Sequence, residues 1–122
     1  MLNITEILNA TRRNGGGTFS LTGDPVPAYG FMVGGNPLKP ERVIPGWESK
    51  HGPLIHAVVR VYARSAELAG LLYLGTWVDP EDGSLVLDAP THVETREIAL
   101  IWAKARGEQA IYDLSTGETI TV

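Results

Sequence analysis

The chain has 122 residues, of which 43% are hydrophobic and 20% are charged, and its formal net charge is −4. This size and composition predict a single globular domain over residues 1–122 and exclude a disordered chain. No apolar run approaches the roughly 20 residues of a membrane span, and the N-terminus lacks the basic-then-apolar order of a signal peptide. We therefore expect no membrane partner and a protein that stays in the compartment where it is made.

The same composition limits the chemistry that the protein can perform. The chain has no cysteine, which excludes disulfides and thiolate chemistry and leaves histidine and carboxylate as the only metal ligands. The negative net charge argues against a general nucleic-acid partner, because phosphate neutralisation needs clustered lysine and arginine. A local basic face is still compatible with this composition.

Residues 1–16 predict a short helix followed by a glycine-rich connector. Residues that can face a core recur at helical spacing: Ile4, Ile7, Leu8 and Thr11. Asn3 or Thr5 can cap the start of this helix, and Gly15 can take the left-handed position after its end. We interpret Gly15 to Gly17 as a helix stop and flexible connector, because they lack the spacing of phosphate-binding loops.

Residues 18–21 and 29–33 predict two strands joined in a loose hairpin by a turn at residues 22–25. Residues 34–52 then form the longest irregular stretch of the chain. Long loops in small domains often carry function, so we single out its charged and aromatic residues: Lys39, Glu41, Arg42, Trp47, Glu48, Lys50 and His51. A surface connector pinned by its apolar residues is the simpler interpretation.

Residues 53–69 predict the main helix, opened by Pro53 and followed by Gly70. Its predicted apolar stripe consists of Leu54, Ile55, Val58, Val61, Tyr62, Ser65 or Ala66, and Leu68. The opposite face carries His56, Arg60, Ala63, Arg64 and Glu67. One histidine and two arginines on a helix face could bind phosphate or an acidic partner, although a solvated polar face is the more common arrangement.

Residues 71–88 contain two apolar runs around a turn at residues 79–83, a pattern typical of a β-hairpin. Alternation places Tyr73, Gly75 and Trp77 on one face of the first run. Both faces carry apolar residues, which predicts a central hairpin that is either covered on both sides or covered on one side and used for binding on the other.

The C-terminal part predicts one more helix and one more hairpin. Thr95 is a good helix cap, and Gly107 ends the helix. The predicted buried stripe of this helix consists of Ile98, Ile101, Trp102 and Ala105. Residues 110–113 and 119–122 predict the final hairpin. The whole order predicts an α+β fold, in which two main helices and the short N-terminal helix pack on an antiparallel sheet built from hairpins.

Three kinds of chemistry fit these residues. A hydrolase or nuclease would pair His51, His56 or His92 with Glu48, Glu67 or Glu94. The favoured version of this site contains His56, Arg60, His92 and Glu94. Its spacing is not specific, so we lean against an enzyme. A metal site lacks the H-E-x-x-H spacing, and we expect neither a metal nor a cofactor.

The third kind of chemistry is partner binding, which requires the fewest special residues. Tyr73 and Trp77 flank Gly75, and two rings with a gap between them make an apolar platform of the type enriched at interfaces. The candidate binding residues are Tyr73, Trp77, Trp47, Arg60 and Arg64. Coverage of the two rings by a helix or by the first hairpin is an equally good interpretation.

About two-thirds of the chain, including the stretch YGFMVGG and the C-terminal half, resembles small uncharacterised proteins encoded by actinobacteria and their bacteriophages. The residues that carry this resemblance are Gly75, Trp77 and Asp79, then Leu87 and Asp88, then Gln109, Ala110, Ile111 and Asp113. The resemblance implies a phage-type accessory protein in the bacterial cytoplasm that binds a host or phage protein. A small nuclease or nucleotide-acting enzyme is one alternative, and a virion or self-assembling structural subunit, hence a homo-oligomer, is another.

Overall fold

The computed structural model describes residues 2–49 and 52–122. Its elements in chain order are α1 (Ile4–Asn14), β1 (Gly16–Ser20), β2 (Phe31–Val33), β3 (Arg42–Ile44), the 3₁₀ helix η1 (Trp47–Ser49), α2 (Gly52–Leu68), β4 (Tyr73–Val78), β5 (Leu85–Asp88), β6 (Thr91–Val93), α3 (Arg96–Ala105), β7 (Ala110–Asp113) and β8 (Thr119–Thr121). The predicted α+β class is confirmed.

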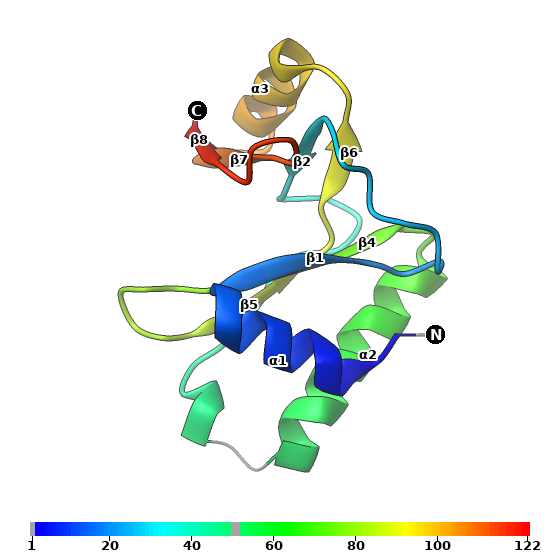
Figure 1. The fold of residues 1–122 in the computed structure, drawn as a ribbon, viewed down its shortest axis with the longest axis vertical. Helices are drawn as coiled ribbons and strands as arrows, with labels where there is room; N and C mark the ends of the chain where they lie inside the picture. Colours follow the sequence, from blue (N-terminus) through cyan, green and yellow to red (C-terminus); the bar gives the residue numbers. More distant parts are fainter. Residues whose placement is uncertain (1, 50–51) are drawn as a thin grey trace.

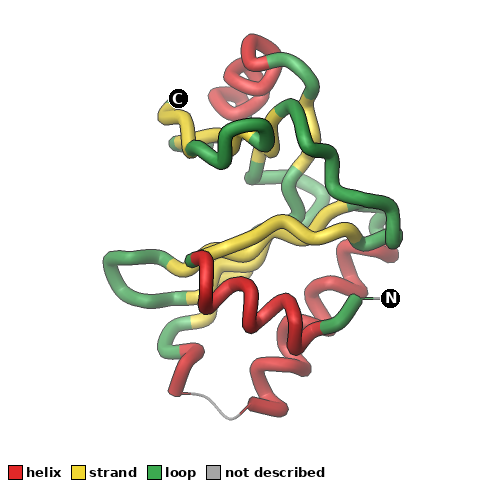
Figure 2. The backbone as a smooth tube through the Cα atoms, in the orientation of Figure 1, coloured by secondary structure: helices red, strands yellow, loops and turns green. Residues whose placement is uncertain are grey.

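The strands form two antiparallel sheets instead of one. The first sheet has the order β1-β4-β5-β3, and the second sheet has the order β6-β2-β7-β8. Figure 1 shows the second sheet and α3 on one side of the first sheet, with α1 and α2 on its other side. The tube in Figure 2 makes the same layers visible. We call the side of the first sheet that packs on α1 and α2 its helical face, and the opposite side its outer face.

Each sheet has its own hydrophobic core. The core on the helical face of the first sheet includes Ile7 and Leu8 of α1, Ile55 and Val59 of α2, and Leu74 of β4. The second core is smaller and lies between α3 and the second sheet. Its fully buried residues are Val33, Ala99 and Ala103. Helices therefore cover one face of each sheet, and the outer face of the first sheet has no part in the larger core.

Local signals at the helix ends are confirmed. The side chain of Asn3 accepts a hydrogen bond from the Glu6 amide at 3.1 Å, and Gly15 after the helix takes the left-handed conformation at φ 77°. At the start of α3, Thr95 Oγ1 accepts from the Ile98 amide at 3.4 Å. These bonds satisfy amide groups that have no partner inside the helix, which is why the sequence locates these ends well.

The hairpin at residues 71–88 is also confirmed and occupies the centre of the first sheet. β4 and β5 pair directly, and the turn between them closes with a bond from the Asp79 amide to the Ser84 carbonyl at 2.9 Å. Gly83 takes φ 73°, the left-handed conformation that this loop requires. Leu85 and Leu87 of β5 are fully buried on the helical face.

The predicted hairpin between residues 18–21 and 29–33 is wrong. β1 pairs with β4, whereas β2 pairs with β6 and β7 in the other sheet. The reason is that the two strands bury their apolar side chains in different cores: Phe19 and Leu21 pack with α1 and α2, and Val33 packs with α3. Nearness in sequence favours a hairpin, but here burial decides the pairing.

Two segments expected to be irregular contain strands. Gly16 and Gly17 begin β1, so of the predicted connector only Gly15 lies between α1 and the sheet. A Cβ on Gly16 would stand 2.6 Å from the Thr76 carbonyl oxygen, which explains a glycine at this edge. The predicted loop at residues 34–52 contains β3, which extends the first sheet beside β5, and η1.

The predicted buried stripe of α3 is wrong. Ile98, Ile101 and Trp102 are exposed, and Ala99 and Ala103 face the core instead. Alanines let the helix approach the second sheet closely, which larger residues would prevent. The predicted stripe of α2 is correct for Ile55, Tyr62 and Ala66, which are buried, and for Val58, which is partly buried against the core. The rest of the stripe is wrong. Leu54, Val61 and Leu68 are exposed, whereas Val59 and Ala63 are buried.

Candidate functional site

The outer face of the first sheet carries a row of apolar side chains on the side away from α1 and α2. Trp77 of β4 lies opposite Val86 of β5, and Val86 lies opposite Val43 of β3. Trp77 is 52% exposed and Val43 is 49% exposed. Because residues directly opposite one another in adjacent strands share a face, these three side chains form one row across the sheet. We call it the Trp77 row.

The space between the rings of Tyr73 and Trp77 is occupied, contrary to the open gap that the sequence suggests. Asp88 lies directly opposite Gly75 in the ladder. A Cβ on Gly75 would overlap Oδ1 of Asp88 and would stand 3.2 Å from Cδ of Pro90. Glycine is therefore needed at position 75 to make room for a carboxyl group, and the outer face combines two aromatic rings with an acid.

Asp88 meets a second carboxyl group where the two sheets join. Oδ2 of Asp88 and Oε1 of Glu108 lie 2.7 and 2.5 Å from the point where a Cβ of Gly34 would stand. Burial, and then the charges of Glu108 and Glu41, raise the pKa of Asp88 to about 6. Burial and Glu41 also raise the pKa of Glu108, while Arg106 acts in the opposite direction.

Arg106 holds the other side of this junction. Its Nη1 donates to the backbone oxygens of Val33 and Gly34 at 3.3 and 3.2 Å and to Oγ1 of Thr91 at 3.1 Å. Its guanidinium carbon lies 5.1 Å from the centroid of the Trp102 ring. Arg106 thus connects the end of α3 to the two segments that run between the sheets.

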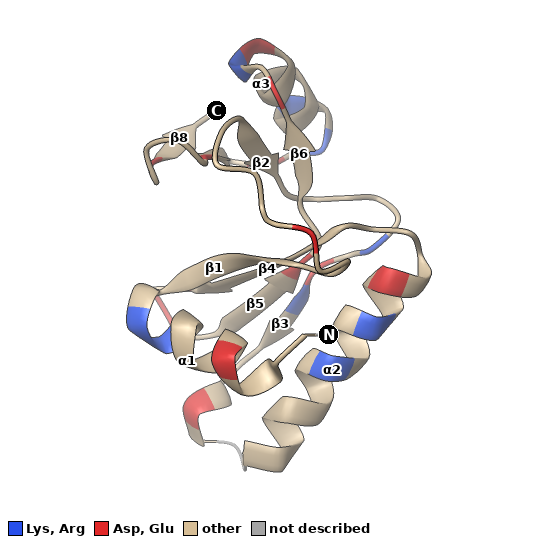
Figure 3. Cartoon of the chain, turned by 45° about the vertical axis from the view of Figure 1, so that its right-hand side comes forward, with Lys and Arg blue, Asp and Glu red and all other residues tan. Residues whose placement is uncertain are grey.

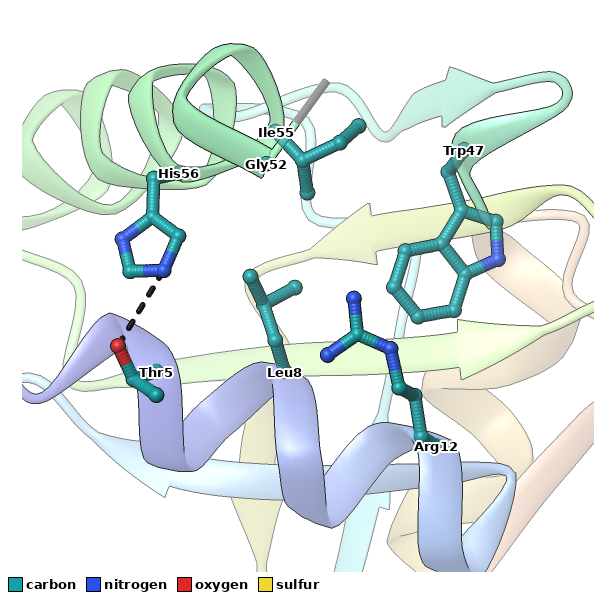
Figure 4. Close-up of a pocket in the computed structure, with 7 residues that line it drawn as sticks. All are labelled: Thr5, Leu8, Arg12, Trp47, Gly52, Ile55 and His56. Atoms are coloured by element: carbon teal, nitrogen blue, oxygen red, sulfur yellow. Dashed lines mark hydrogen bonds between the residues drawn. The ribbon is translucent and has the colours of Figure 1, made fainter. Parts of the chain in front are cut away.

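A cavity of about 190 Å³ lies between α1, η1 and α2, on the helical side of the first sheet. The residues that line it, drawn in Figure 4, are Thr5, Leu8, Arg12, Trp47, Gly52, Ile55 and His56. Nε2 of His56 lies 3.3 Å from Oγ1 of Thr5, and the guanidinium carbon of Arg12 lies 5.0 Å from the centroid of the Trp47 ring. The cavity unites Trp47 and His56, two residues predicted for different sites, with Arg12, which the sequence singles out for no site.

The four residues of the predicted catalytic site do not come together. His56 and Arg60 lie on α2, whereas His92 lies in β6, and Figure 1 shows these elements on opposite sides of the first sheet. His92 is already engaged, since its Nε2 lies 2.8 Å from the backbone oxygen of Tyr29 and the two rings meet edge-on. Glu94 is exposed just after β6.

The predicted binding residues also separate. Arg60 and Arg64 are exposed on α2, and Arg64 pairs with Glu67 as their spacing predicts. Trp47 is only 2% exposed, so it supports the fold and cannot offer its ring to a partner. Lys50 and His51 lie outside the described residues. Tyr73 and Trp77 remain together on the outer face, as predicted from the alternation of β4.

No three histidine or carboxylate side chains in residues 2–49 and 52–122 are arranged to hold a metal ion. Over the same residues, every helix is too short or too polar to reach across a bilayer. The chain matches no protein-family model, no curated protein and no solved structure.

Proposed function

We propose that this protein is a binding module that holds a protein partner against the outer face of the first sheet. The observation that carries the proposal is the Trp77 row, in which a half-exposed tryptophan continues into Val86 and Val43 across three strands. Exposed aromatic residues in a flat apolar row are typical of interfaces, because they bury a large area with little loss of side-chain entropy.

The charges around the Trp77 row favour a partner with basic residues. The strand positions that face outward with Trp77 contain no lysine or arginine in the described part of the first sheet. Two carboxylates lie near the Trp77 row. Asp79 directly follows β4 and accepts a hydrogen bond from the Glu81 amide in the turn at 2.9 Å, and Asp88 lies opposite Gly75 on the outer face. Figure 3 shows charged positions on α1, α2 and α3, while β1 of this sheet is uncharged.

These carboxylates also argue against nucleic acid on this face, because they would repel phosphates. We therefore propose a partner surface that presents an apolar residue flanked by lysine or arginine. The resemblance to small proteins of actinobacteria and their phages provides the setting for this proposal, a phage-type accessory protein in the bacterial cytoplasm whose partner is a host or phage protein.

Self-assembly as a virion or structural subunit is the second candidate. It is favoured by a specific observation, the exposed apolar side of α3 formed by Ile98, Ile101 and Trp102. A subunit of this kind would be oligomeric in solution, and light scattering at several concentrations distinguishes it from a monomeric binding module. The nuclease alternative receives no such support, because its candidate residues lie on opposite sides of the first sheet.

The test is capture of the partner from bacterial lysate by the tagged protein, with and without nuclease, followed by mass spectrometry. Trp102→Ala is the matched control, since Trp102 is also a partly exposed tryptophan but lies on α3. We expect Trp77→Ala to lose the captured protein and Trp102→Ala to keep it. Circular dichroism and thermal melting confirm that both variants fold.

Equal capture by wild type and Trp77→Ala would refute the role of this face. Loss of capture after nuclease treatment would refute a protein partner. As an independent measurement, capture should weaken as salt rises, because screening reduces the attraction between carboxylates and basic residues. Capture that is insensitive to salt would contradict the basic partner surface.

A further inference from the structure

The cavity between α1 and α2 contains a cation that its surroundings hold in place. The guanidinium of Arg12 stacks on the buried ring of Trp47, with 5.0 Å from its carbon to the ring centroid. Nε of Arg12 donates to Oε1 of Glu48 at 3.0 Å, and Nη1 donates to Oδ1 of Asn9 at 3.4 Å. Among the described residues, Nη2 has no hydrogen-bond partner. Arg12 is thus fixed in orientation and keeps a donor for a ligand.

The other polar groups of the cavity can also donate. Thr5 contributes a hydroxyl group and His56 an imidazole, and Figure 4 shows them across the cavity from Arg12. Gly52, the first residue of α2, also lines the cavity. The partial positive charge at the start of this helix therefore also favours a negatively charged ligand. The described lining residues include no aspartate or glutamate. A set of donors without a carboxylate favours an anion.

The rest of the lining is apolar. Leu8, Ile55 and Trp47 are each at most 3% exposed and form the inner wall of the cavity. Such a wall is poorly suited to a fully hydrated ion such as phosphate, because it offers nothing to replace the lost water. The volume of about 190 Å³ holds about six water molecules at the roughly 30 Å³ that each occupies in the liquid.

From this geometry we infer that the cavity between α1 and α2 binds a small carboxylate with a short apolar body. The carboxylate accepts hydrogen bonds from Arg12 and from His56 or Thr5, and the apolar body packs against Leu8 and Ile55. Glu48 stays on the outer side of the Arg12 guanidinium, as a carboxylate on Nε does not block the terminal nitrogens. This site is separate from the Trp77 row and does not depend on the proposed partner.

Butyrate is a suitable probe, since it has a carboxylate and a three-carbon chain within the size of the cavity. We expect saturable NMR shifts of the Thr5 amide, the Trp47 indole and the His56 ring with a Kd of about 1 mM, as a ligand of this size allows. Butanol keeps the whole three-carbon chain but has a neutral CH2OH group in place of the carboxylate, and we expect it to produce no saturable shift. Inorganic phosphate should bind at least ten-fold more weakly than butyrate.

Arg12→Gln should weaken butyrate binding about ten-fold, which is the loss of one charge-assisted hydrogen bond. The matched control is Arg13→Gln, because Arg13 is the adjacent exposed arginine of α1 but does not line the cavity. It should leave the Kd unchanged within about two-fold. The double variant Thr5→Val/His56→Leu removes both donors of the opposite wall, and it provides the test if Arg12→Gln does not fold, as judged by the dispersion of its spectrum.

Several outcomes would overturn the assignment. These are the absence of saturable shifts with butyrate, shifts confined to residues outside the cavity, or a Kd equal to that of wild type for Arg12→Gln or for the double variant Thr5→Val/His56→Leu. Tighter binding of phosphate than of butyrate would refute the apolar body of the ligand. Equal binding of butanol would refute the role of the charge.

Discussion

Replacing Asp88 by asparagine should stabilise the protein above neutral pH. Asp88 is partly buried between Gly75 and Gly34 and lies near Glu108, and partial burial and the neighbouring carboxylates raise its pKa from the usual 3.8 to about 6. Raising the pKa from 3.8 to about 6 corresponds to a free-energy difference of about 3 kcal/mol between the protonated and ionised forms. Since the folded-state pKa is raised, the protonated carboxyl is fully compatible with the fold below pH 4. The loss of stability grows as the pH rises from about 4 to about 6, where the unfolded chain ionises first, and it is complete above the folded-state pKa of about 6.

Asparagine has nearly the same shape, is neutral at every pH and can donate a hydrogen bond to Glu108. We therefore expect Asp88→Asn to raise the free energy of unfolding by up to about 3 kcal/mol at pH 8 and to change little at pH 4. Urea unfolding at a series of pH values measures this difference. The reasoning fails if the variant is no more stable than wild type at pH 8, or if the difference is the same at both ends of the series.

Asp82, whose pKa is lowered and not raised, provides the control. Asp82 lies in the exposed turn of the central hairpin, and hydrogen bonds from Ser84 lower its pKa. Its contribution to stability is present above the unfolded-state pKa and is lost as the pH falls through the lower folded-state value. Asp82→Asn should therefore flatten the acid side of the stability profile, lowering the stability by a constant amount above the unfolded-state pKa and leaving it unchanged below the folded-state pKa.

Three further changes test the packing. Gly75→Ala should destabilise the protein by about 1–3 kcal/mol in urea unfolding, because its methyl group overlaps Asp88; unchanged stability would contradict the close contact. Thr11→Val should cost about 1–3 kcal/mol because it leaves the buried hydroxyl of Thr76 without its 2.7 Å partner, and adding Thr76→Val should recover part of the loss. A double variant that loses the sum of both single losses would refute this coupling. Ala103→Leu should cost about 1–3 kcal/mol by overfilling the core under α3, whereas Ile101→Ala on the exposed side should stay within about 0.5 kcal/mol in thermal melting. Equal effects of these last two changes would contradict the orientation of α3.

The local parts of this fold could be read from the sequence. The alternation of residues 71–88 and the capping residues Asn3 and Thr95 act over a few residues, so their signal is complete within a short window. The α+β class follows from the resulting order of helices and hairpins. The pairing partners of β1 and β2 could not be predicted in this way. Each strand pairs where its apolar side chains are buried, and the two cores form only when distant segments of the chain come together.

The orientation of α3 shows why periodicity alone can mislead. The large residues Ile98, Ile101 and Trp102 and the small residues Ala99 and Ala103 both recur at helical spacing, and hydrophobicity favours burying the larger set. The structure buries the alanines, because a helix with a small-residue face can lie closer to the sheet. The choice depends on the depth of the space available, which the sequence of the helix does not contain.

The candidate sites divide in the same way. The pairing of Tyr73 with Trp77 on one face follows from alternation within a single strand. The approach of Asp88 to Glu108 and the stacking of Arg12 on Trp47 join residues from distant segments. No short sequence motif predicts either contact, so both could be identified only from the folded structure.

The alternation of strands between the two sheets imposes an order on biosynthesis. Every strand of the first sheet lies within the first 88 residues, so this sheet can close as soon as β5 has left the ribosome. β2 has to wait, because its two neighbours are β6 and β7, which are translated some sixty residues or more after it. At about 5–20 residues per second, its apolar side chains stay unpaired for several seconds. During that interval the nascent chain contains a folded first sheet and an exposed β2 that chaperones can recognise.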